Sequence, residues 1–147
     1  MENINKIKAS IISIAGLIGS VAAHFLGGWD MALQTLIIFM GIDYLTGLLV
    51  AGVFHNSGKS QNGALESRAG WKGLCRKGMT LLIVLVAAQL DKVAGTDVIR
   101  NAAIIAYIVN ETISIIENAG LMGLPIPSII RKALDLLSKQ AEGSEVK

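Results

Sequence analysis

The chain has 147 residues and a mass of 15.5 kDa, which is the size of one small domain. Hydrophobic residues make up 52% of the chain and charged residues 16%, whereas a soluble domain carries about 25% charged residues. The net charge of +2 is too small to indicate nucleic-acid binding, and the single cysteine, Cys75, excludes an internal disulfide and a multi-cysteine metal site.

Charged residues are distributed very unevenly along the chain. Residues 9–58 contain two charges, Asp30 and Asp43, and residues 78–90 contain none, whereas the segment between them is basic. A soluble helix or strand needs a face that water can solvate, and the uncharged segments do not supply one. A bilayer is the solvent that suits them.

These segments predict an all-α membrane protein with three to four transmembrane helices in a single domain over residues 1–140. The predicted spans are residues 9–26, 31–54, 78–96 and 98–119. Residues 9–26 at about 1.5 Å per residue cover roughly 27 Å, enough for a thin bilayer. Asp43 costs about 3 kcal/mol within the second span, which its apolar neighbours outweigh. The third apolar run is short and the fourth span is polar, so the sequence leaves three spans and four spans as alternatives.

Amphipathic segments follow the second and fourth spans. Residues 55–77 form a basic interfacial loop with helical character, and its membrane-surface candidates are Arg68, Trp71, Lys72, Arg76 and Lys77. Trp71 can enter the interface while the cations meet anionic lipid. The prolines at 125 and 127 break the chain, residues 128–140 form a short amphipathic helix, and residues 141–147 form a polar tail.

The distribution of Lys and Arg predicts the orientation in the membrane. With four spans, one side holds eleven cations and the other holds only Lys92 and Arg100. The eleven are Lys6, Lys8, Lys59, Arg68, Lys72, Arg76, Lys77, Arg131, Lys132, Lys139 and Lys147. With three spans the split becomes seven to six. The positive-inside rule therefore favours four spans with both termini in the cytoplasm. Cleavage of the first segment as a secretory signal near residues 20–22 is an alternative.

Polar residues within the spans are the candidates for function. Asp43 is an ionisable residue at membrane depth, and such residues mark pores or contacts between helices. A further set in the fourth span recurs at helical spacing and predicts one polar face, for which a helix lying on the membrane surface is the alternative. Its members are Arg100 or Asn101, Tyr107, Asn110 or Glu111, Ser114, and Glu117 or Asn118.

Small residues in the first two spans are candidates for helix packing. They are Ala15, Gly16, Gly19, Ser20, Ala23, Gly41 and Gly47. Small residues four apart allow helix backbones to approach in lipid, so they would serve self-assembly. We find no arrangement of residues typical of catalysis, and we expect no metal, no cofactor and no nucleic-acid partner.

Three parts of the sequence resemble the toxin-secretion and phage-lysis holin family. They are residues 41–47 (Gly-Ile-Asp-Tyr-Leu-Thr-Gly), residues 67–77 with Gly70, Lys72, Gly73 and Lys77, and the run from Arg100-Asn101 through Asn110-Glu111 to residues 117–120. Gly123, Pro125, Ile126 and Pro127 extend the resemblance, which covers about residues 35–137 in order along the chain.

The resemblance implies a bacteriophage protein of the host cytoplasmic membrane, and membership of a family usually described with about three spans. Holins self-assemble into lesions that release an endolysin, or in some members a toxin. The alternatives are an antiholin or other non-lytic membrane protein, and a small ion or solute transporter with Asp43 or Glu111 as its gating carboxylate. Which residues line a hole is our inference from their polarity, not a property of the family.

Overall fold

The computed structural model describes residues 1–57 and 67–144, which form five helices and no strand. The helices are α1 (Glu2–Phe25), α2 (Met31–Gly52), α3 (Ser67–Ala94), α4 (Val98–Leu121) and α5 (Ser128–Ser144). Four of them, α1 to α4, are long and apolar enough to cross a membrane. The chain is therefore an all-α protein with the features of a multi-pass membrane protein, as its sequence predicts.

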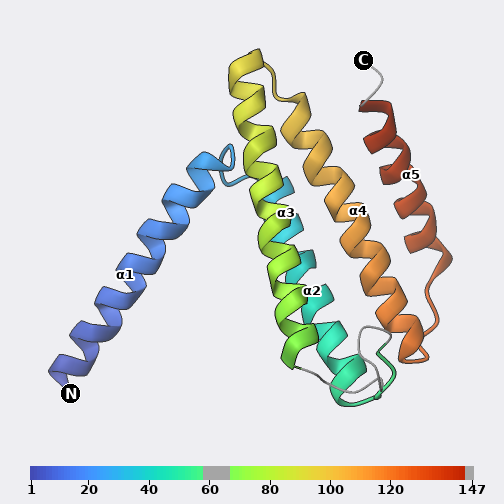
Figure 1. The fold of residues 1–147 in the computed structure, drawn as a ribbon, viewed down its shortest axis with the longest axis horizontal. Coiled ribbons are helices and arrows are strands. Elements are labelled where there is room, and N and C mark those ends of the chain that lie inside the picture. The colour runs from blue at the N-terminus through green and yellow to red at the C-terminus, as the bar shows by residue number, and fades with distance from the viewer. Residues whose placement is uncertain (58–66, 145–147) are drawn as a thin grey trace.

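Helices α2, α3 and α4 pack into a bundle, and α5 lies along the outer side of α4 (Figure 1). The core between the bundle helices is made of aliphatic side chains. Its buried members are Leu26, Leu33, Leu36, Met40, Val84, Ile104 and Ile108. Successive helices run in opposite directions, so the α1–α2 and α3–α4 connections lie together at one end of the bundle.

Helix α1 stands away from the bundle and contacts it only near its C-terminal end (Figure 1). None of its residues is buried, and its isoleucines are exposed all along its length. The amide of Gln89 on α3 donates to the carbonyl of Phe25 across 3.0 Å. Gly27 and Gly28 then take positive φ angles of 91° and 106°, which turn the chain into α2.

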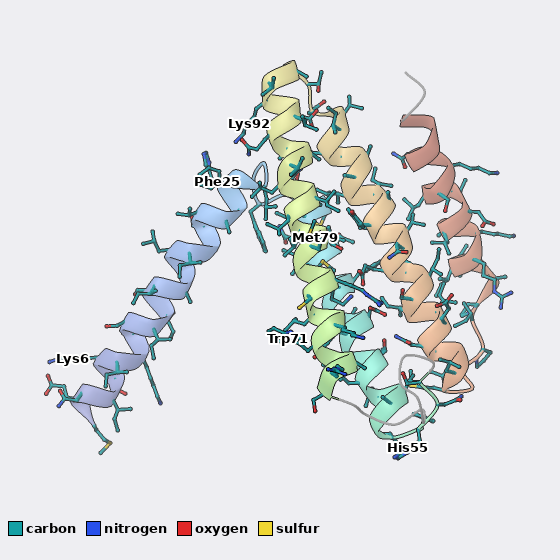
Figure 2. The ribbon with its side chains drawn as sticks, in the orientation of Figure 1. Lys6, Phe25, His55, Trp71, Met79 and Lys92 are labelled. Atoms are coloured by element: carbon teal, nitrogen blue, oxygen red, sulfur yellow. The ribbon has the colours of Figure 1, made fainter. Side chains whose placement is uncertain are left out.

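The basic segment at residues 67–77 is not a separate interfacial loop, because it forms the first three turns of α3. Nothing in this stretch breaks a helix, and Gly70 and Gly73 lie against the ring of Tyr44 on α2. Figure 2 shows Trp71 pointing away from the bundle. Residues 58–66 of the predicted loop lie outside the described part of the chain. Helix α5 also continues past residue 140 to Ser144, so only residues 145–147 of the predicted tail lie outside that part.

Candidate functional site: two buried polar clusters

A charged cluster joins the three bundle helices at mid-length. The ammonium Nζ of Lys77 on α3 lies 2.8 Å from Oδ2 of Asp43 on α2 and 2.5 Å from Oε2 of Glu111 on α4. The exposed fractions of these three side chains are only 12%, 10% and 7%. One ammonium group therefore bridges two carboxylates, and each helix of the bundle supplies one of the three charges.

Asn118 holds Asp43 from the other side. Its Nδ2 donates to Oδ1 of Asp43 across 3.1 Å and to the hydroxyl oxygen of Thr46 across 2.9 Å. The Asn118 side chain also lies beside Gly47, where a Cβ would be 3.8 Å from Nδ2. Both oxygens of the Asp43 carboxylate thus have partners within the bundle, as a buried polar group requires.

The electrostatics of this cluster make it a strong constraint on helix packing. Removing charges from water is costly, and their mutual attraction repays the cost only with good geometry and further hydrogen bonds. Here two carboxylates share one ammonium group, so the cluster carries a net charge of −1 when both are ionised. The groups can hold α2, α3 and α4 in one register, and they can rearrange only if new partners or water replace the old ones.

A second cluster lies at the end of the bundle where the two connections meet. The guanidinium of Arg100 donates to the carbonyls of Leu26 and Gly28 in the α1–α2 connection, the latter across 3.2 Å. Its Nη1 lies 2.6 Å from Oδ2 of Asp30. Arg100 therefore ties the α1–α2 connection to the start of α4.

Carboxylates at this end cap the two helices that begin there. Asp30 accepts from the backbone N–H of Leu33 and so caps α2, while Asp91 accepts from the backbone N–H groups of Ile99 and Arg100 at the start of α4. The hydrogen bond from Arg100 holds the pKa of Asp30 below its ordinary value, against the opposing effect of partial burial.

The polar residues predicted for one face of α4 divide between two faces. Glu111 and Asn118 are buried in the bundle, whereas Asn110 and Glu117 are exposed. Each pair is seven residues apart, which is about two helical turns, but adjacent residues differ by about 100° around the axis. Arg100 belongs to the cluster at the helix end, Asn101 is exposed and Ser114 is partly buried.

Lys77 is the residue whose role differs most from the sequence-based expectation. Arg68, Lys72 and Arg76 are exposed on α3, but Lys77 turns inward to the carboxylates. The three exposed cations recur every fourth residue, and Lys77 falls outside that spacing. Two signals in the sequence therefore distinguish Lys77 from the exposed cations. It falls outside their spacing, and it stands at the start of the apolar run.

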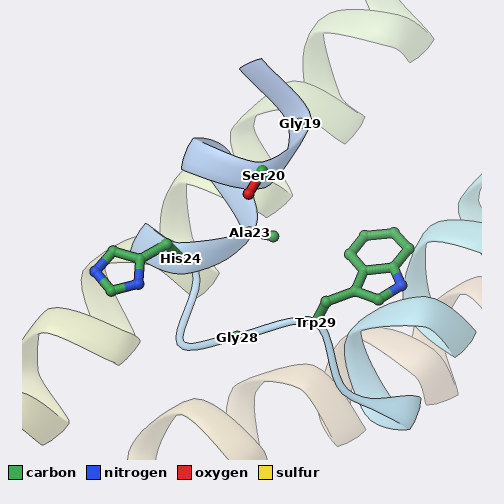
Figure 3. Close-up of a pocket in the computed structure, with 6 residues that line it drawn as sticks. All are labelled: Gly19, Ser20, Ala23, His24, Gly28 and Trp29. Atoms are coloured by element: carbon green, nitrogen blue, oxygen red, sulfur yellow. The ribbon is translucent and has the colours of Figure 1, made fainter. Parts of the chain in front are cut away.

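The two glycines of α1 have no neighbour among the described residues. A Cβ on Gly16 or Gly19 would meet nothing within 4 Å, and the same holds for Gly41 on α2. Ala15, Ser20 and Ala23 are not buried either. A shallow hollow lies between the last turns of α1 and the turn to α2, with His24 and Trp29 on either side of Ala23 (Figure 3).

Metal-binding and nucleophilic groups are sparse in the part of the chain that the structure describes. Within residues 1–57 and 67–144, no three His, Cys, Asp or Glu side chains are grouped so as to hold a metal ion. Cys75 is an exposed free thiol on α3.

Comparisons with known proteins place this geometry in context. A sequence model described as "Bacteriophage holin family" matches residues 20–139. An uncharacterized 14.9 kDa protein in the nagH 3′ region of Clostridium perfringens is 38% identical over 143 residues, covering 95% of this chain and 99% of that protein. A probable holin of Bacillus phage phi105 is 31% identical over 118 residues, covering 80% of this chain and 82% of that protein. No solved structure matches the chain.

Proposed function

Because this chain belongs to the bacteriophage holin family, we propose that it collects in the host cytoplasmic membrane and self-assembles into lesions. These lesions would release an endolysin, or a toxin, and so lead to lysis of the host. Family membership is the observation that carries the proposal, since the family points to a membrane protein without enzymatic activity. Four apolar helices are compatible with this role.

We propose an orientation with both termini in the cytoplasm. The exposed cations Arg68, Lys72 and Arg76 lie in the first turns of α3, at the bundle end opposite Lys92 and Arg100. The positive-inside rule assigns the end richer in cations to the cytoplasm. Anionic headgroups of the inner leaflet would then meet this basic strip, with Trp71 in the interface.

The Lys77 cluster is our candidate for the contacts that change on assembly. The ion pairs and hydrogen bonds of Asp43, Lys77 and Glu111 satisfy their charges within one copy. Lipid offers no polar group that could replace these partners. Separation of the bundle helices would therefore require the same groups to pair between copies or to meet water. Water recruited along Asp43 and Glu111 would begin an aqueous path, and Asn110 and Glu117 would extend it on the outer face of α4. Small residues on α1, with Gly41, would allow copies to approach closely.

A buried carboxylate–ammonium cluster also favours a second candidate, a small ion or solute transporter. Such a protein would move its substrate in a regular, saturable manner with the host intact. An antiholin would differ from both, because its expression alone would leave the membrane potential unchanged.

Induction in bacteria tests the proposal. Membrane potential is followed with a dye, and passage is followed with reporters of graded size. A holin gives an abrupt loss of potential at a reproducible time. Asp43→Asn and Glu111→Gln are expected to change that time at equal accumulation in the membrane, whereas Glu117→Gln makes the same chemical change as Glu111→Gln at an exposed position. Equal timing of all variants and the parent chain would remove the cluster from the mechanism.

A further inference from the structure

Helix α5 combines a covered apolar strip, an uncovered apolar strip and a charged strip. It contacts α4 and no other helix of the described chain, and its partly covered side chains are Leu134, Leu137 and Ser138. Ile129 and Leu136, on the adjoining side, are 70% and 69% exposed. The remaining strip is charged and exposed, and its members are Arg131, Lys132, Asp135 and Lys139.

The position of α5 conflicts with a transmembrane position of α4. The two helices lie side by side along most of their length (Figure 1). If α4 crosses the bilayer, the charged strip of α5 is brought to hydrocarbon depth, where charged side chains are costly. A helix with one apolar and one charged face instead suits the boundary between headgroups and acyl chains. That boundary would cover Ile129 and Leu136 as well as Leu134 and Leu137.

We propose that α5 leaves α4 in the bilayer and docks on an anionic membrane surface. Three cations and one anion lie on its exposed strip between residues 128 and 140, and with Glu142 the whole helix has a net charge of +1, which is complementary to anionic headgroups. The connection from Met122 to Pro127 is free of helix and can act as the hinge, with Gly123 at a φ of 81°. Departure of α5 would uncover one side of α4 for a second copy, and this consequence rests on the proposed function.

The position of α5 can be measured on purified protein, without any lysis assay. In a Cys75→Ser background, spin labels are attached at Asn101→Cys on α4 and Gln140→Cys on α5. Figure 1 shows the C-terminal part of α5 beside the first half of α4. A helix of 17 residues is about 26 Å long, so docking on the surface moves its far end by a distance on that order.

The expected distance between the two labels is short in detergent micelles, where no bilayer is present, and longer by roughly 15 Å or more in phosphatidylcholine vesicles that contain anionic phosphatidylglycerol. Labels at Asn101→Cys on α4 and Lys92→Cys on α3 serve as the control. The distance between them is expected to be the same in both conditions. An unchanged distance from position 101 to position 140 in anionic vesicles would overturn the proposal.

Variants at two adjacent leucines distinguish the contribution of the α4 contact from that of general membrane affinity. Leu137→Asn weakens the strip that lies against α4, and it is expected to lengthen the distance even in detergent micelles. Leu136→Asn changes an exposed position and is expected to leave that distance short. Identical behaviour of the two variants would contradict the proposal. If the distances shift as expected while no variant lyses cells, docking stands and the lesion-forming function fails.

Discussion

Gly27 and Arg100 fit together only because Gly27 has no side chain. A Cβ at position 27 would lie 2.6 Å from Cδ and from Nε of Arg100. The guanidinium needs this position because it donates to the carbonyls on both sides of Gly27. The turn from α1 to α2 and the arginine of α4 are therefore one structural unit.

Gly27→Ala is expected to destabilise the protein more than Gly28→Ala. Both glycines have positive φ, so both substitutions carry a similar backbone strain of about 1 kcal/mol. At Gly28 a Cβ meets nothing within 4 Å, so the difference between the two variants measures the displacement of Arg100. Thermal unfolding in detergent gives the comparison. Equal melting temperatures would show that Arg100 moves aside without loss.

Lys77→Met is expected to cost about 3–5 kcal/mol of unfolding free energy, because it leaves two buried carboxylates without a cation. Lys72→Met is the matched control on the same helix, and its exposed position predicts a change within about 0.5 kcal/mol. Unfolding is measured by chemical denaturation in detergent.

A neutral version of the cluster provides the reciprocal test. Lys77→Met combined with Asp43→Asn and Glu111→Gln is expected to recover most of the stability that Lys77→Met loses, because no unpaired charge remains. A triple variant as unstable as Lys77→Met alone would show that the lost hydrogen bonds of the ammonium group, and not the unpaired charge, account for the loss.

Acid is expected to remove the ion pair between Arg100 and Asp30. Since the hydrogen bond from Arg100 lowers the pKa of Asp30, the pair stabilises the fold above the ordinary aspartate pKa of about 3.9 and is lost as the pH falls through the lower folded value. Asp30→Asn keeps an N-cap for α2 and removes only the charge. The Asp30 side chain is 47% exposed, so the expected loss at pH 7 is about 1 kcal/mol.

Melting temperatures of Asp30→Asn and the parent chain, taken at pH 7 and at pH 3, test whether the stabilisation by the Asp30 charge is lost in acid. The parent chain is expected to melt at a higher temperature than Asp30→Asn at pH 7, and this difference should shrink below about pH 4. Asp97→Asn, at the start of α4, is the control because Asp97 makes no side-chain cap bond. A difference of constant size across the range would assign the effect of Asp30 to something other than its charge.

The sequence was sufficient to predict the helices that could span a membrane, because the exclusion of charge is a local property. It was also sufficient to mark Asp43 and Glu111 as unusual. It could not show that Lys77 lies between them, because the direction of that side chain depends on the packing of three helices. The spacing of Arg68, Lys72 and Arg76 separates Lys77 from the surface strip, but it does not name a partner.

The relation of α1 and α5 to the bundle was not predictable for a similar reason. The sequence of α5 shows an apolar face with charged residues opposite, which describes a helix at any boundary and does not specify α4 as its neighbour. In α1 the large residues Ile7, Ile11 and Ile18 share one side of the helix and the small residues share the other, but this pattern does not show that neither side packs along the bundle. Arg100 illustrates the same limit, since its main partners are backbone carbonyls in a turn 74 residues away in sequence.

Labelling at the two ends of α4 is expected to show that this helix crosses the membrane. In a Cys75→Ser background, Asp97→Cys and Leu124→Cys place single exposed thiols before and after α4. With both termini in the cytoplasm, a membrane-impermeant maleimide should react with position 97 in intact spheroplasts. Position 124 should react only after the membrane is permeabilised.

Labelling is done before any loss of membrane potential, so that the reagent does not enter through lesions. Reaction of both thiols from the same side would mean that α4 does not span, and the orientation of the C-terminal part would be reversed relative to the one proposed.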